Sequence, residues 1–202
     1  GNVTITIAKA TQAAVTASAT RTTSTYADGT SNTVALSGGS GTGATSFAST
    51  TASVCSIDAT TGVLTVLTAG TCSITVTKAA DTNYNVATAS ITITINKATQ
   101  ATFTVSSAPS NSTFGSATTV TISGTGGSGT GAVSYATTTA SVCSVNASTG
   151  VITIVTAGTC SVTATKAADT NYNVASGSTS VVIGKATRVA PAQSWCAQGK
   201  RL

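Results

Sequence analysis

The sequence predicts an all-β protein made of two tandem copies of one small antiparallel Greek-key sandwich. Three observations lead to this prediction. The composition favours strands over helices, an internal repeat divides most of the 202 residues into two copies, and short alternating apolar segments are separated by turn residues. Each copy has fewer than ninety residues, which limits the core that it can bury without further cross-links.

The composition is typical of strands. Threonine is the most abundant residue, Ser, Ala, Gly and Val supply most of the remainder, and Glu, His and Met are absent. Thr and Val are branched at Cβ and fit a pleated, half-buried surface better than a helix. We therefore expect no long helix.

An offset of 88 residues relates the two copies. The stretch TKAADTNYNVA at 77–87 recurs unchanged at 165–175, and GGSGTGA at 38–44 recurs at 126–132. Under this shift 30 of the 38 residues from 50 to 87 are identical. A fixed period of this kind indicates repeated structural units, and the sequence predicts one domain over 8–95 and a second over 96–183.

Neither end of the chain forms a complete copy of the repeat. Residues 1–7, GNVTITI, align with 89–95, ASITITI, the last strand expected in the first copy. Residues 184–202 begin as a third copy would and then become a basic tail. We expect either a piece of a longer array or a subunit whose spare strand joins a neighbour.

Alternation of apolar and polar residues defines the expected strands of one copy. In CSITVT the inward positions are Cys72, Ile74 and Val76, and in SITITI they are Ile91, Ile93 and Ile95. Gly, Asp and Asn turn signals separate the strands. The seven expected strands of the first copy cover 13–18, 32–37, 44–49, 53–57, 63–67, 72–77 and 90–95. With no helix for parallel crossovers, they describe a Greek-key sandwich.

Four cysteines are expected to pair within the copies. Cys55 is in phase with Ile57 and so faces the core, as Cys72 does, and one strand separates the two. We predict the disulfides Cys55–Cys72 and Cys143–Cys160. A zinc site is the alternative, but it needs four N or S ligands, and each copy offers two Cys and no His. Disulfides place a protein in an oxidising, extracytoplasmic compartment.

With GGSGTGA, the paired cysteines, TAGTC, TKAADTNYNVA and a final TITI-type strand in this order, each copy resembles the bacterial immunoglobulin-like (Big-type) repeats of secreted and cell-surface proteins. The resemblance covers about 8–183 and implies tandem Ig-like domains that form rods, stalks or fibres. In that family an Ala-Gly-Thr turn leads into the penultimate strand, which matches 69–71 and 157–159. The tryptophan typical of antibody cores is missing, so the likeness is to the bacterial class only.

Several kinds of chemistry are disfavoured. With no His or Glu and four isolated Asp, the chain offers no paired carboxylates and few bases for a nucleophile, so we expect no enzyme. The net charge of +5 comes mainly from the tail, which argues against nucleic-acid binding, and no segment is long and apolar enough to span a membrane. We expect no cofactor and no metal. Asp81, Asn83 and Asn85 alternate as in a calcium loop, but one carboxylate is few for that ion, and turn capping is the favoured role.

These observations favour a structural protein of the bacterial exterior, a subunit of an extracellular fibre or stalk that self-associates head to tail. Uncharged edge strands invite strand addition from a neighbour. The candidate assembly contacts are Val3, Ile5, Ile7, Trp195 and Cys196. The alternatives are an adhesin module that recognises a glycan or host surface protein through GGSGTG and its neighbouring loops, and a passive spacer from a larger adhesin.

Overall fold

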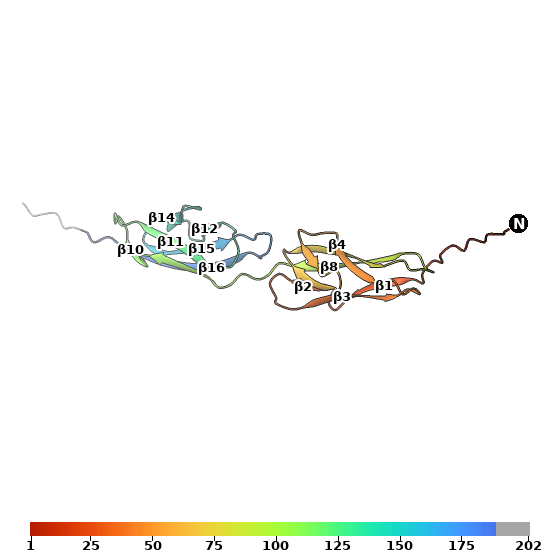
Figure 1. The fold of residues 1–202 in the computed structure, drawn as a ribbon. Coiled ribbons are helices and arrows are strands. Elements are labelled where there is room, and N and C mark those ends of the chain that lie inside the picture. Colours follow the sequence, from red (N-terminus) through yellow and green to blue (C-terminus); the bar gives the residue numbers. More distant parts are fainter. Residues whose placement is uncertain (189–202) are drawn as a thin grey trace, which may run out of the picture. The chain divides into compact units, whose positions relative to one another are not determined.

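The computed structural model describes residues 1–188. They divide into two compact units, one built around strands β1 to β8 and the other around β9 to β16. The first unit also includes residues 126–132 and 166–175. Every regular element in this part of the chain is a strand (Figure 1). The chain thus forms two tandem Ig-like β-sandwiches, as the sequence predicts.

The first sandwich contains two four-stranded sheets. One has the order β1-β3-β6-β5 and the other β2-β8-β7-β4. The strands are β1 (Val15–Ala19), β2 (Thr23–Thr25), β3 (Asn32–Gly38), β4 (Thr45–Ser49), β5 (Cys55–Ile57), β6 (Val63–Val66), β7 (Gly70–Lys78) and β8 (Ala87–Asn96). All seven strands expected from the sequence are present, with shifts of a few residues at their ends.

The long hairpin β7–β8 is the centre of its sheet. Its antiparallel register pairs Cys72 with Ile93 and Ile74 with Ile91. The inward side chains Cys72, Ile74, Val76 and Ile93 are completely buried, as their alternation predicts. Burial of such side chains is the main stabilising contribution to the sandwich.

The second sandwich repeats this arrangement. Its sheets have the orders β13-β14-β11-β9 and β10-β16-β15-β12. The strands are β9 (Phe103–Ala108), β10 (Asn111–Thr113), β11 (Val120–Gly126), β12 (Val133–Thr137), β13 (Cys143–Val145), β14 (Val151–Ile154), β15 (Gly158–Lys166) and β16 (Ala175–Gly184). Its core includes Val120, Ile122, Val162, Val181 and Ile183.

Each sandwich has one disulfide that joins its two sheets. Cys55 on β5 bonds Cys72 on β7, with a Cα–Cα distance of 5.7 Å. Cys143 on β13 bonds Cys160 on β15 at the same Cα–Cα distance. All four cysteines are completely buried. Each bond therefore fixes the two layers of a sandwich to each other from within the core.

One short strand in each copy was not expected from the sequence. β2 runs parallel to β8, with Thr23 opposite Thr94, and β10 runs parallel to β16. The other strand pairs of the first sandwich are antiparallel. β2 has only three residues and no apolar alternation, so its place depends on β8, some seventy residues away in sequence.

Candidate interaction surfaces

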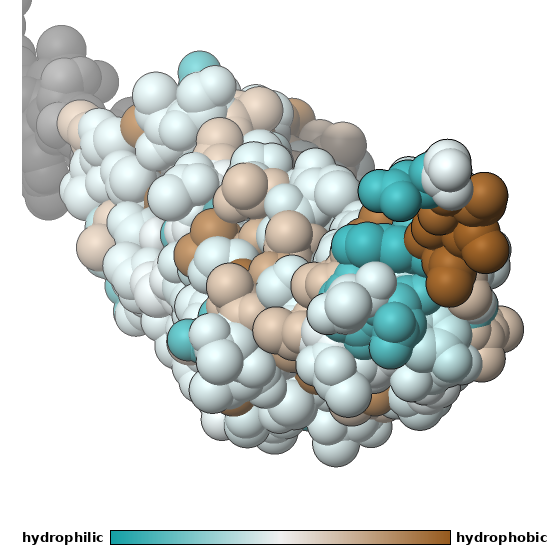
Figure 2. Space-filling model, turned by 45° about the vertical axis from the view of Figure 1, so that its right-hand side comes forward, coloured by the Kyte–Doolittle hydropathy of each residue, from teal (hydrophilic) through white to brown (hydrophobic). Residues whose placement is uncertain are grey.

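The first candidate surface is the segment of residues 1–7, which forms no strand and lies exposed. Val3, Ile5 and Ile7 are 87%, 81% and 89% exposed. Figure 2 shows hydrophobic side chains gathered at the end of the molecule where the N-terminal segment lies. Three large aliphatic side chains on one short segment lie open to water, although burial would be strongly favourable.

The same sequence pattern is buried elsewhere in the chain. Val3, Ile5 and Ile7 correspond to Ile91, Ile93 and Ile95 of β8, 88 residues later. There, Ile93 is completely buried and Ile95 is 3% exposed, because β8 lies between β7 and β2. Residues 1–7 therefore have the sequence of a central strand without the neighbours of one.

The second candidate surface is the glycine-rich loop of 38–44 together with the loop of 81–85. Asp81 connects them, because its Oδ2 accepts the N–H of Thr42 at 2.6 Å and its Oδ1 accepts the N–H groups of Asn83 and Tyr84, both at 2.8 Å. These donors, the Thr42 N–H first, lower the pKa of Asp81 from 3.8 to about 2. The carboxylate of Asp81 thus serves as a turn cap, the role that the sequence favoured over a calcium ligand.

A buried glutamine anchors the same loops from the other side. Gln12 is 6% exposed, and its Nε2 donates to the carbonyls of Ala79 and Asn85 at 3.2 and 2.9 Å. Its Oε1 accepts the N–H of Gly41 at 3.2 Å. The sequence reasoning did not single out Gln12, although the same residue type occurs 88 residues later in KATQ, which was the available signal.

The glycine-rich loop is held in place rather than free. A Cβ on Gly43 would come within 2.0 Å of the carbonyl oxygen of Ala79, so only glycine fits there without a shift of the backbone. The loop joins β3 to β4 and precedes no helix, so it lacks the geometry of a phosphate-binding loop. The hydrogen bonds to Asp81 and Gln12 hold this loop in place.

The second copy contains the same network. Asp169 accepts the N–H groups of Thr130, Asn171 and Tyr172, which lower its pKa from 3.8 to about 2. Gln100 occupies the position of Gln12 and donates to Ala167 and Asn173. Two copies of one hydrogen-bonded loop pair therefore occur in the chain.

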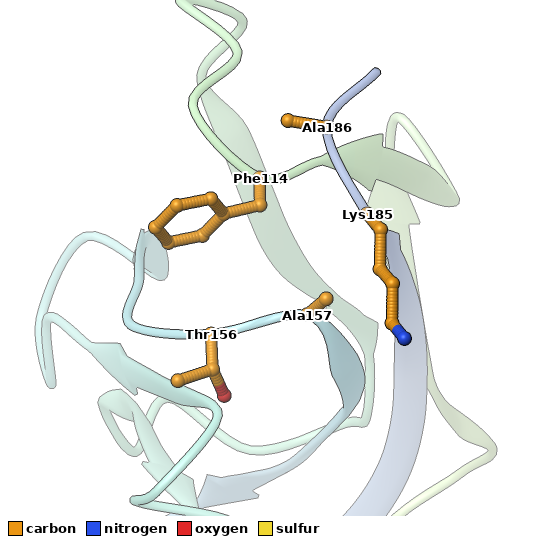
Figure 3. A pocket seen from close by; sticks show the side chains of 5 residues that line it. All are labelled: Phe114, Thr156, Ala157, Lys185 and Ala186. Atoms are coloured by element: carbon orange, nitrogen blue, oxygen red, sulfur yellow. The ribbon is translucent and has the colours of Figure 1, made fainter. Parts of the chain in front are cut away.

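The third candidate surface is an apolar hollow of about 330 Å³ in the second sandwich, lined by Phe114, Thr156, Ala157, Lys185 and Ala186. The ring of Phe114 lies on one side, and Lys185 and Ala186 lie on the other (Figure 3). Phe114 is 45% exposed. The sequence reasoning missed this hollow because its residues come from three separate stretches of the chain.

In the first copy, the residues that correspond to Phe114 and Ala157 are in contact with other residues of the first unit. Phe114 corresponds to Tyr26, and the Tyr26 ring packs edge-on against Tyr172 with centroids 5.6 Å apart. Ala157 corresponds to Ala69, whose N–H donates to Oδ1 of Asn171 at 2.9 Å. Both contacts lie inside one compact unit. In the first unit, Asn171 and Tyr172 therefore lie against the residues that correspond to Ala157 and Phe114.

The described acidic side chains lie apart and cap turns. Within residues 1–188 there is no cluster of three or more His, Cys, Asp or Glu side chains. Asp28, besides accepting backbone N–H groups, pairs with Arg21 at 3.1 Å, and Asp58 accepts the N–H groups of Thr60 and Thr61. No helix in the described chain is long and apolar enough to cross a membrane. The predicted contacts Trp195 and Cys196 lie outside the described residues.

No family model matches this sequence, and no curated protein does either. Solved structures do match. Mouse cadherin-23 EC22–24 is 14% identical with a TM-score of 0.36, covering 85% of this chain and 67% of that one. Domains 1–6 of the surface layer protein SbsC are 19% identical with a TM-score of 0.34, covering 91% of this chain and 29% of that one.

A third match is the C-terminal 282-residue fragment of intimin in complex with the intimin-binding domain of the translocated intimin receptor. It is 16% identical with a TM-score of 0.32, covering 84% of this chain and 63% of that one. Likenesses this distant define neither a family nor a function for the chain. The resemblance to bacterial Ig-like repeats remains a prediction from the sequence motifs.

Proposed function

We propose that the chain is a non-enzymatic structural module of the bacterial exterior, the subunit of an extracellular fibre or stalk whose copies associate head to tail. The observation that carries the proposal is the exposed segment 1–7, with three aliphatic side chains more than 80% exposed in the pattern of a buried strand. Extended segments of this kind add to a sheet of another molecule through main-chain hydrogen bonds.

The disulfides support the proposed location. Each sandwich encloses one fully buried disulfide, and such bonds persist in oxidising compartments outside the cytoplasm. An array of sandwiches in that compartment needs no cofactor for a structural role.

Self-association is the property that tests the proposal. Sedimentation velocity over a hundredfold range of protein concentration is expected to show species larger than one chain that grow with concentration. Negative-stain microscopy of the same samples is expected to show linear assemblies. A chain that stays monomeric at the highest concentration would overturn the fibre proposal.

Adhesin function is the second candidate, supported by the fixed glycine-rich loops. Because Asp81 and Gln12 hold the loop of 38–44, a ligand that binds there orders little additional backbone. A screen of glycans and matrix proteins is expected to give binding that Asp81→Asn weakens. A negative screen together with the absence of self-association would leave the role of a passive spacer.

A further inference from the structure

We propose that a hollow beside Tyr26 binds a neutral saccharide. The inference rests on the adhesin role and places the ligand at the second copy of the glycine-rich loop, 126–132, rather than at the first. The hollow measures about 350 Å³, which is within the usual range for small-molecule sites. It is lined by Tyr26, Ser128, Thr130 and the residues of 169–172, all of which belong to the first compact unit.

Every side chain that lines the hollow carries a group able to form hydrogen bonds. The lining consists of two tyrosines, three residues with aliphatic hydroxyl groups, one carboxylate and one amide. The tyrosines also offer the apolar surface of their rings. A ligand that matches this lining needs C–H surface for the rings and several hydroxyl groups for the remainder. A sugar ring has both.

Several of these groups are available to a ligand. Asn171 accepts the N–H of Ala69 with Oδ1, which leaves its Nδ2 free to donate. Ser128 accepts the N–H of Ala101 with Oγ and keeps its own hydroxyl hydrogen for another acceptor. Within the described residues, the hydroxyl groups of Thr170 and of the two lining tyrosines have no hydrogen-bond partner. Because a sugar hydroxyl both donates and accepts, it can pair with each of these groups.

The charge of the lining favours a neutral ligand over an ionic one. Asp169 is the one charged side chain of the lining, and its carboxylate already accepts three backbone N–H groups. Lys97 donates to the backbone carbonyl of Asp169 and does not line the hollow. A phosphate or carboxylate ligand would therefore meet no cation in the lining, and one capped carboxylate is too few for a calcium ion.

The loops that form the hollow are fixed by hydrogen bonds of the protein itself. Asp169 joins its own turn to the glycine-rich loop by accepting the N–H of Thr130 at 2.6 Å. Gln100 holds the same loop by accepting the N–H of Gly129 at 3.1 Å. The two tyrosine rings lie at 85° to each other with centroids 5.6 Å apart. A ligand that binds here orders little additional chain, which lowers the entropic cost of binding.

The first copy provides an internal comparison, because its loops have the same lining residues at 40, 42 and 81–84. The aromatic partner differs, however. Tyr26 lies against Tyr172, whereas its counterpart in the first copy, Tyr84, forms a β-bridge with Ala10. We therefore expect one saccharide site in each chain, although the loops occur twice.

Saturation-transfer NMR on the intact, oxidised chain tests for the site. The probes are the methyl glycosides of glucose, galactose, mannose and N-acetylglucosamine, together with maltose and lactose, each at millimolar concentration. At least one probe is expected to show transfer to its ring protons, and Tyr172→Ala is expected to weaken its binding at least tenfold. Titration calorimetry with that probe should give one site per chain. No transfer to any of these probes would overturn the proposal, and so would two equal sites per chain.

A milder substitution tests the site without a change in the fold. Thr170 is exposed, so Thr170→Ala should leave the unfolding midpoint unchanged while it removes one hydrogen bond to the saccharide. We expect binding to weaken about threefold. The matched control is Thr82→Ala, the same change in the first copy, which should leave binding unchanged. Equal effects of the two substitutions would contradict the proposed position.

The outcomes separate this site from the adhesin role on which it rests. Saccharide binding that Asp81→Asn weakens, and that Tyr172→Ala and Thr170→Ala leave unchanged, would place the ligand on the loop of 38–44. This result would overturn the site at Tyr26 and leave the adhesin role standing. Binding of a matrix protein without binding of any saccharide probe would do the same. A chain that binds neither overturns both.

Discussion

At the scale of single residues, a few polar side chains hold the loops of each copy. Asp81 and Asp169 each accept three backbone N–H groups, which are donors that a turn leaves unpaired. The sequence predicted the capping role from residue type. It could not predict that Thr42, 39 residues away, supplies the third donor, because that contact depends on how β4 and β7 pair.

The lowered pKa of Asp81 and Asp169 makes the stability of the sandwiches dependent on pH. A folded-state pKa of about 2, below the ordinary 3.8, means that ionised Asp stabilises the fold above pH 4. This contribution is lost as the pH falls from about 4 to about 2. We expect the urea midpoint, followed by circular dichroism, to decline over that interval, and Asp81→Asn to lower the midpoint at pH 7 and flatten the decline.

The chain supplies a matched control for this substitution. Asp58 accepts the N–H groups of Thr60 and Thr61 with Oδ1 alone, and the second copy has Asn146 in this place with the same two contacts. Asp58→Asn should therefore change the midpoint at pH 7 less than Asp81→Asn. Equal effects of the two substitutions would show that the second carboxylate oxygen of Asp81 contributes nothing.

At the scale of elements, period-two alternation located seven strands of the first copy and missed β2. β7 and β8 could be predicted because their inward residues are apolar without exception over several positions. β2 could not, because Thr23 to Thr25 resemble any polar loop, and the hydroxyl of Ser24 is buried with no hydrogen-bond partner. The pairing of Cys55 with Cys72 was predicted because both lie at inward positions of alternating strands. Only the fold shows that this disulfide joins two different sheets.

Reduction of the disulfides is expected to destabilise each sandwich by about 3 kcal/mol, because each bond closes a loop of sequence separation 17 in the unfolded chain. Denaturant unfolding with and without a reducing agent measures this. The double variant Cys55→Ala and Cys72→Ala should lower only the transition of the first sandwich. An unchanged free energy of unfolding would contradict this account of the bonds.

At the scale of the whole molecule, the expected domain boundaries can be tested with fragments. Because Gln12 is buried and donates to Ala79 and Asn85, a fragment of residues 8–95 should fold, and one of 13–95 should be less stable by about 1–3 kcal/mol, the loss of two hydrogen bonds. Fragments 1–95 and 8–95 should unfold at the same denaturant concentration, since residues 1–7 form no strand and are exposed. A stabilising effect of residues 1–7 would place them in the first domain.

The candidate surfaces could be predicted only in part. Val3, Ile5 and Ile7 stood out because a repeat makes an extra strand visible in the sequence. The Phe114 hollow did not, since Phe114, Ala157 and Ala186 come together only when the strands are placed.

The disulfide between the two sheets also has a consequence under mechanical tension. When a sandwich is pulled from both ends, the residues between Cys55 and Cys72 cannot extend, however far the remaining strands separate. Single-molecule pulling should show that each sandwich lengthens by about 60 Å more on unfolding after reduction, the span of some seventeen extended residues. The oxidised chain should thus lengthen less under a given force than the reduced chain, and equal lengthening in the two states would rule this out.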